Sequence, residues 1–173
     1  EITDFWELVF NPSSMDRLFH TLCGAWQAGA FLVVSVSAYY LLKNRHQDFA
    51  RTSLRAGLIV GLIASLLQLV SGHDSAVGVA QNQPEKLAAF EGLYDTTANA
   101  PLSLFGWVNE KKEKIEANVT MPSLLSWLVH GDASKPVKGL REFKPEDRPP
   151  VNFSFQLYHI MVATGFGMIL VAV

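Results

Sequence analysis

The chain has 173 residues and a formal net charge of −2 at pH 7, with 49% hydrophobic and 17% charged residues. A soluble domain carries about 25% charged residues, so this composition favours a membrane protein. The net charge says little about partners, and we expect no nucleic-acid partner. Cys23 is the only cysteine in the sequence, which excludes an intrachain disulfide and a cluster of thiolate ligands.

The first long apolar segment is 18–42, which follows an aromatic and acidic lead-in at 1–17 that suits a periplasmic or interfacial stretch. The segment runs 25 residues without Lys, Arg, Asp or Glu, and a helix of that length is about 37 Å long, enough to cross a hydrocarbon core of about 30 Å. Near its start lies His20, which is costly to leave unpaired inside a membrane. His20 is therefore either a functional group or a residue hydrogen-bonded at headgroup depth, and this segment alone leaves both interpretations open.

The charges around the next connection predict an orientation in the membrane. Residues 43–55 contain four basic side chains and one acidic side chain, so the connection 43–52 is predicted to be cytoplasmic by the positive-inside rule. The segment 53–72 reaches the roughly 20 residues needed for a second span. It contains Gly57 and Gly61 at a spacing that permits close helix packing, a common and therefore weak signal.

Residues 73–152 are predicted to form a large polar loop on the periplasmic side. Most of this loop, 74–148, contains 9 Lys or Arg against 11 Asp or Glu. Within it, 83–91 has the pattern of a short amphipathic helix, with Pro84 in its first turn and Gly92 as its stop.

The rest of the loop offers two weaker patterns. The charge run at 110–116 is typical of a solvated face, and the apolar stretch at 121–129 predicts a short interfacial helix anchored by Trp127. The last apolar segment, 153–173, is the third spanning candidate. The sequence therefore predicts an all-α membrane protein with three transmembrane helices and a periplasmic loop containing short helices. We expect the chain to be an excerpt of a larger membrane protein.

The predicted topology brings three possible metal ligands to a similar shallow depth. His20 lies near the start of the first span, and His159 and Met161 lie near the start of the third. A histidine and a methionine are a known axial pair for a low-spin haem. A methionine in an apolar helix is far more often simple packing, and a lone histidine is more often a satisfied polar residue. Spacing alone therefore leaves a haem as the minority interpretation.

Three strings in the sequence resemble subunit I of cytochrome bd-type quinol oxidases. They are FHTL at 19–22, VAQNQPEKLAAFEG at 79–92 and YHIMVA at 158–163, and the second is the most specific. The resemblance covers essentially the whole chain, but only the middle portion of that subunit, from its fifth to its seventh helix.

The resemblance implies a low-spin haem b whose axial ligands are His20 and Met161, and a quinol oxidised at the periplasmic loop. In that loop, Lys86 and Glu91 match positions implicated in quinol oxidation. A carboxylate can accept a quinol proton and a lysine can hydrogen-bond a quinol oxygen. The alternative for Lys86 and Glu91 is an exposed, solvated helix pair. Oxygen reduction is not expected from this stretch alone, because further haems belong to the rest of the subunit.

Two departures from the family pattern affect these expectations. The family often has arginine two residues before the methionine ligand, where a cation can pair with a haem propionate. This chain has His159 there, so we expect that contact to be weaker or pH-dependent. The stretch GHD at 72–74 also differs from the Gly-Asp that the family suggests.

The implied setting is the cytoplasmic membrane of a bacterium or archaeon. The expected partners are quinol, the lipid bilayer, the remainder of subunit I and a second oxidase subunit. Two other classes remain possible from the sequence: a haem-free membrane scaffold, and a transporter segment that uses His20 and His159 as a proton relay.

Overall fold

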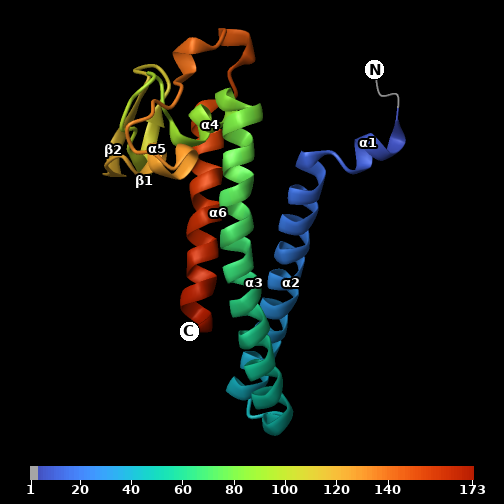
Figure 1. Ribbon diagram of the computed structural model, residues 1–173. Coiled ribbons are helices and arrows are strands. Elements are labelled where there is room, and N and C mark those ends of the chain that lie inside the picture. Colours follow the sequence, from blue (N-terminus) through green and yellow to red (C-terminus); the bar gives the residue numbers. More distant parts are fainter. Residues whose placement is uncertain (1–3) are drawn as a thin grey trace. The chain divides into compact units, whose positions relative to one another are not determined.

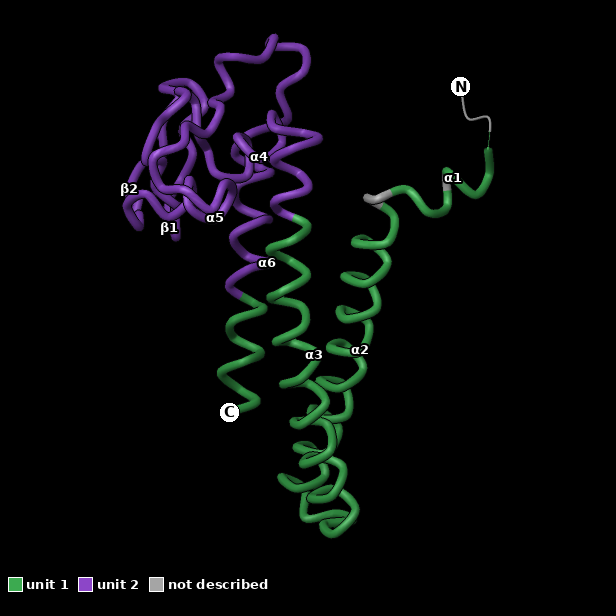
Figure 2. Tube along the Cα trace, viewed as in Figure 1, with its two compact units in different colours: residues 1–75, 164–173 green, residues 76–163 purple. Residues whose placement is uncertain are grey.

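The computed structural model describes residues 4–173, apart from the side chains of Leu8, Pro12 and Ser13. The helices, drawn in Figure 1, are α1 (Phe5–Val9), α2 (Pro12–Leu42), α3 (Gln47–Asn82), α4 (Pro84–Glu91), α5 (Leu124–His130) and α6 (Val151–Ala172), with short 3-10 turns at Leu140–Glu142 and Pro145–Asp147. The strands are β1 (Leu102–Asn109) and β2 (Lys114–Met121). Two compact units divide the chain, one made of residues 1–75 and 164–173 and the other of residues 76–163 (Figure 2). We call them unit 1 and unit 2.

Both long helices of unit 1 extend beyond the spans that hydropathy predicts. The side chain of Asn11 accepts a hydrogen bond of 3.0 Å from the backbone of Ser14, and proline follows it at the first helical position. Helix α2 therefore begins at Pro12, before the apolar run at 18–42. Helix α3 has 36 residues and continues to Asn82, because nothing between Gly72 and Asn82 breaks a helix.

Two glycines let α2 and α3 approach closely. A Cβ added to Gly57 would lie 3.2 Å from the carbonyl oxygen of Ala30, and one added to Gly61 would lie 3.1 Å from the ring of Phe31. Nearby, the buried side chain of Gln27 donates a 2.8 Å hydrogen bond to Ser65. The small residues at this spacing thus perform the packing role that the sequence predicted.

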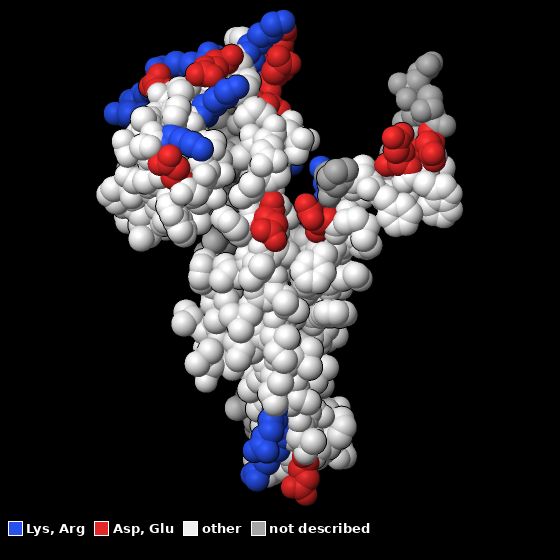
Figure 3. Space-filling view, viewed as in Figure 1, with Lys and Arg blue, Asp and Glu red and all other residues white. Residues whose placement is uncertain are grey.

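Within residues 4–173, three helices are long and apolar enough to cross a membrane. Their outer surfaces carry exposed hydrophobic side chains, such as Leu32 on α2 and Leu170 on α6. In Figure 3 the visible surface of α2 and α3 is almost free of charge except near the helix ends. This pattern is typical of helices that face lipid or other apolar helices.

Unit 2 contains an antiparallel hairpin, so the prediction of an all-α protein is wrong for this part of the chain. Strands β1 and β2 pair from Leu102 opposite Met121 to Asn109 opposite Lys114. The turn forms because the Asn109 side chain accepts a hydrogen bond from the backbone of Lys112 and donates one to Glu116. The charge run at 110–116 is therefore a hairpin turn and the start of a strand.

The predicted short helices in this part of the chain are present as α4 and α5. Helix α4 begins at Pro84 and ends before Gly92, as the sequence predicted. Helix α5 begins at Leu124, because β2 continues to Met121. Trp127 on α5 is 56% exposed, while Leu125 is buried in the core of unit 2.

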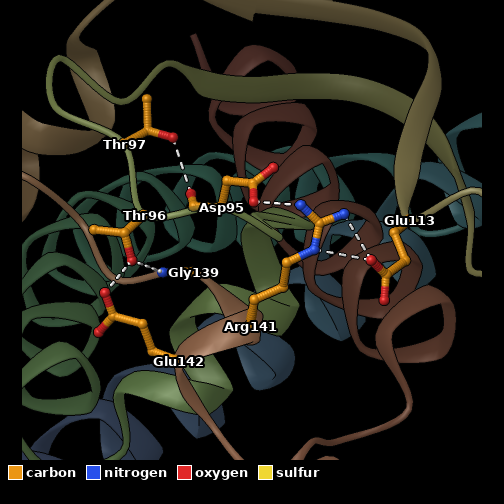
Figure 4. A network of polar contacts seen from close by, with 7 residues as sticks. All are labelled: Asp95, Thr96, Thr97, Glu113, Gly139, Arg141 and Glu142. Atoms are coloured by element: carbon orange, nitrogen blue, oxygen red, sulfur yellow. Dashed lines mark hydrogen bonds and ion pairs between the residues drawn. The ribbon is translucent and has the colours of Figure 1, made fainter.

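A polar network holds three segments of unit 2 together (Figure 4). Arg141 contacts Asp95 and also binds Glu113 at the hairpin turn through its Nη2, 2.7 Å from the Glu113 carboxylate. Thr96 accepts a hydrogen bond from the backbone of Gly139. These contacts fix the hairpin and the segment at 139–142 against the turn that follows α4.

Candidate functional site

Helix α4 carries its last residue, Glu91, into the interior of unit 2. Leu87, Ala88 and Ala89 form the buried face of this helix, and Glu91 itself is 4% exposed. Gly92 then ends the helix with a φ of 61°, a conformation that strongly favours glycine. A Cβ at Gly92 would also lie only 2.9 Å from the side chain of Ile115. This glycine therefore permits a close approach at the helix end where the buried Glu91 lies.

Burial changes the chemistry of the Glu91 carboxyl group. Desolvation raises its pKa from 4.5 to about 8, and a backbone hydrogen bond from Ser103 on β1 acts in the opposite direction. Its Oε2 has no hydrogen-bond partner among the described residues. A carboxyl group with this pKa exchanges a proton close to neutral pH, which is the property required of a general base or acid.

Helix α4 also carries Lys86 and Phe90, and the ring of Phe90 contacts α6. The Nζ of Lys86 lies 5.6 Å from the ring centroid of Phe90, which is a cation–π distance. The ring of Phe90 stacks on Tyr158 of α6, with centroids 4.8 Å apart and planes 1° apart. Lys86 is exposed, and none of the ion pairs in the described part of the chain joins it to Glu91. Helix α4 thus carries an exposed ammonium group, one ring of a stacked pair and a buried carboxyl group.

His159 follows Tyr158 and contacts β1. Its Nε2 lies 2.8 Å from the carbonyl oxygen of Ser103, and its Nδ1 lies 2.8 Å from the carbonyl oxygen of Phe155. The rings of Phe155 and His159 stack with centroids 4.0 Å apart. Both ring nitrogens therefore have backbone partners within unit 2.

His20 belongs to unit 1, where residues of α3 contact both of its ring nitrogens. Nδ1 lies 2.9 Å from the hydroxyl of Ser71, and Nε2 lies 2.8 Å from the amide nitrogen of Gln68. An amide nitrogen can only donate, so this network makes Nε2 the acceptor and Nδ1 the N–H donor. This is the tautomer of a histidine that binds iron through Nε2 while a neighbour orients the ring through Nδ1.

Met161 belongs to unit 2 and is 57% exposed on α6. Its thioether therefore has little packing role within the chain. An imidazole nitrogen and a thioether, the groups that His20 and Met161 carry, are donor types that a low-spin haem iron takes. The buried Oε1 of Gln68 lacks a hydrogen-bond partner among the described residues.

The structure places Glu91, Lys86 and His159 in unit 2, where Glu91 and His159 both contact Ser103, whereas His20 lies in unit 1. Sequence reasoning missed Ser103, whose backbone groups contact both Glu91 and His159. It also missed Tyr158, although this residue lies in the YHIMVA string. The position of Tyr158 next to His159 and near Met161 was a signal that could have identified it. Ser103 acts through its backbone, and such a contact leaves no signal in the sequence pattern.

Comparisons with known proteins agree on one family. The family model for cytochrome bd terminal oxidase subunit I matches residues 1–173. The chain is 35% identical over 182 residues to the cytochrome bd ubiquinol oxidase subunit 1 of Bacillus subtilis, covering 99% of this chain and 39% of that protein. It is 38% identical over 150 residues to the cytochrome bd-II ubiquinol oxidase subunit 1 of Escherichia coli, covering 86% of this chain and 29% of that protein.

A solved structure gives the same result at the level of the fold. The bd oxidase from Geobacillus thermodenitrificans matches with a TM-score of 0.90 and 31% identity, over 98% of this chain and 39% of that chain. The chain thus spans 40% or less of the length of these curated relatives.

Proposed function

This chain belongs to the cytochrome bd terminal oxidase subunit I family, and from that membership we propose that it is the part of such a subunit that oxidises quinol and holds a low-spin haem b. The observation that carries the proposal is the buried Glu91 at the end of α4, beside the stack of Phe90 and Tyr158. The oxygen-reducing site and the second oxidase subunit belong, in this proposal, to parts of the complex outside this stretch.

Quinol oxidation releases two protons and two electrons, and the residues at α4 match the proton chemistry. The Glu91 carboxylate accepts a proton from the quinol hydroxyl, and its pKa of about 8 makes it a stronger base than an exposed glutamate. Lys86 donates a hydrogen bond to a quinol oxygen. The rings of Phe90 and Tyr158 offer an apolar, planar surface for the quinol ring.

We further propose that His20 and Met161 are the axial ligands of the haem. A haem held by these residues would supply a one-electron acceptor for quinol oxidation. Ser71 holds the His20 ring through Nδ1 and so keeps Nε2 unprotonated for iron. Purified complete oxidase should show a Soret band and a low-spin b-type difference spectrum. A protein without these bands would instead fit a haem-free scaffold or a transporter segment.

The proposed orientation places residues 43–52 in the cytoplasm and the hairpin turn in the periplasm. Gln47 and Lys111 are both exposed, and the native Cys23 is fully buried, so cysteines placed at the two exposed positions can be labelled selectively. In intact cells an impermeant thiol reagent should label Lys111→Cys and should label Gln47→Cys only after the membrane is opened. The reverse pattern would invert the topology.

Removal of Lys86 should weaken quinol binding more than it slows the chemistry. Lys86→Ala deletes one charged hydrogen-bond donor, so we expect the apparent KM for quinol to rise about tenfold while kcat changes less than about twofold. Steady-state quinol oxidation by the complete oxidase measures both constants. Lys135→Ala, at another exposed lysine of unit 2, is the matched control and should leave both unchanged. An equal effect of the two substitutions would indicate a general charge effect.

A further inference from the structure

The contacts of His159 point into unit 2. Its two ring nitrogens face the carbonyl oxygens of Ser103 and Phe155, each at 2.8 Å. A carbonyl oxygen only accepts hydrogen bonds, and a neutral imidazole carries one N–H, so the ring donates to one of these two carbonyls at a time. In this arrangement neither nitrogen is free for a haem propionate, which was the role that the family resemblance suggested for this position.

Ser103 connects His159 to the carboxyl group of Glu91. The Ser103 backbone hydrogen bond lowers the pKa of Glu91, so the peptide N–H of Ser103 is the donor and the carboxylate is the acceptor. In an extended strand the N–H and C=O of one residue point to the same edge. Ser103 is 5% exposed, so both of its groups make these contacts in the protein interior. One residue of β1 thus contacts His159 through its carbonyl and Glu91 through its N–H.

A second path of contact runs through Phe155. This side chain is 1% exposed, and its ring stacks on the ring of His159. The ring also lies 3.3 Å from the position that a Cβ would occupy at Gly92, the residue after Glu91. His159 therefore supports, from α6, both the strand and the helix end that hold the carboxyl group.

Given the proposed quinol oxidation, we propose that His159 is a positioning residue for Glu91, and that its Nε2–H holds the Ser103 peptide so that the peptide N–H stays on the carboxyl group. Without that donor, β1 is free to move away from α4 at Ser103. The carboxylate then loses the hydrogen bond that stabilises its charged form.

The titratable side chains on the elements around Glu91 are Glu85 and Lys86 on α4, Tyr94 after it, Lys114 and Glu116 on β2, and Tyr158 and His159 on α6. The influences on the pKa of Glu91 are burial, which raises it, and the Ser103 hydrogen bond, which lowers it. Loss of the Ser103 contact should therefore raise the pKa of Glu91 further and shift the pH dependence of turnover to higher pH.

Two substitutions at His159 separate the two ring contacts. Glutamine places an amide nitrogen near the position of Nε2 and keeps a donor for Ser103, whereas asparagine places one near Nδ1 and keeps a donor for Phe155. In the complete oxidase, His159→Asn should move the pH profile of kcat upward by about one unit and lower kcat at pH 7 about tenfold, with little change in KM. His159→Gln should retain the wild-type profile.

A second measurement reads the carboxyl group without reference to turnover. The infrared C=O band of protonated Glu91 is the band that Glu91→Gln removes, and its titration gives the pKa of Glu91 directly. We expect this titration to move upward in His159→Asn and to stay unchanged in His159→Gln. The haem difference spectrum should be the same in both variants.

Three results would overturn the proposal. The first is an equal shift of the infrared titration in both variants, and the second is no shift in His159→Asn. The third is an altered haem potential together with an unshifted titration, and this result would indicate that His159 contacts a haem propionate. A different result would contradict the proposed quinol oxidation itself, namely normal quinol kinetics in Glu91→Gln. In that case the infrared titration still decides whether His159 positions Glu91.

Discussion

Replacing Met161 with leucine in the complete oxidase is expected to abolish the low-spin haem spectrum while the protein still folds. Leucine has nearly the volume of methionine, and Met161 is 57% exposed within this chain, so the packing cost is small. The substitution removes the thioether and leaves His20 as the one axial ligand in our assignment. Methionine ligation raises the haem potential, so its loss should also lower the potential and slow electron transfer from quinol.

The measurement is a reduced-minus-oxidised spectrum with a redox titration of the purified complex. Met168 lies two turns further along α6, on nearly the same side of the helix, and Met168→Leu is therefore a matched control. The control should retain the low-spin bands and the wild-type potential. An unchanged spectrum in Met161→Leu would show that Met161 is not a ligand.

The helical part of the fold could be predicted because hydropathy acts over long windows. Runs such as 18–42 need no tertiary contact to be recognised, since length and the absence of charge decide them. The ends of the helices could not be predicted this way. Helix α2 begins before the apolar run because the side chain of Asn11 caps it, and α3 continues through a polar stretch that contains no helix-breaking residue.

The hairpin was missed because its turn lacks the usual two-residue signal. Its turn is built by Asn109 and by a positive φ at Glu113, with neither Asn-Gly nor Asp-Gly present. The charges around it suggested a solvated surface, which is also true of the turn. The strands have irregular pairing near Phe105, so an alternating pattern was weak in the sequence.

The candidate site was predicted unevenly for a similar reason. The similarity of residues 79–92 to the family pointed to Lys86 and Glu91 as a pair, with a solvated helix pair as the alternative. The structure shows different environments for the two residues, because Lys86 is exposed whereas Glu91 is only 4% exposed. Gly92, the residue after Glu91, packs closely against Ile115 and Phe155, which are distant in sequence. Local spacing contains no information about such contacts.

Glu91→Gln is expected to lower quinol turnover about 100-fold at pH 8, by removing the proton acceptor while keeping the shape of the side chain. The pH dependence provides a sharper criterion. With a pKa of about 8, roughly one tenth of Glu91 is ionised at pH 7, so wild-type kcat should rise close to tenfold between pH 7 and pH 9. The variant has no group to titrate at this position, and its residual turnover should vary little across this range.

Glu91→Gln, which lowers turnover, should raise the stability of the fold at high pH. The pKa of Glu91 is higher in the folded chain than the ordinary value of 4.5, so between pH 4.5 and about 8 the folded state holds more protons than the unfolded state. The stability contributed at this position therefore falls as pH rises through that window and levels off above it.

Because Glu91→Gln lacks this ionisation, the variant should unfold at a higher temperature than wild type at pH 9 but not at pH 4.5. Thermal unfolding of both proteins at the two pH values, beside the turnover assay, measures this difference. A variant that lost turnover and was also destabilised at pH 9 would contradict the role of Glu91 as a buried base, because the loss would then follow from damage to the fold.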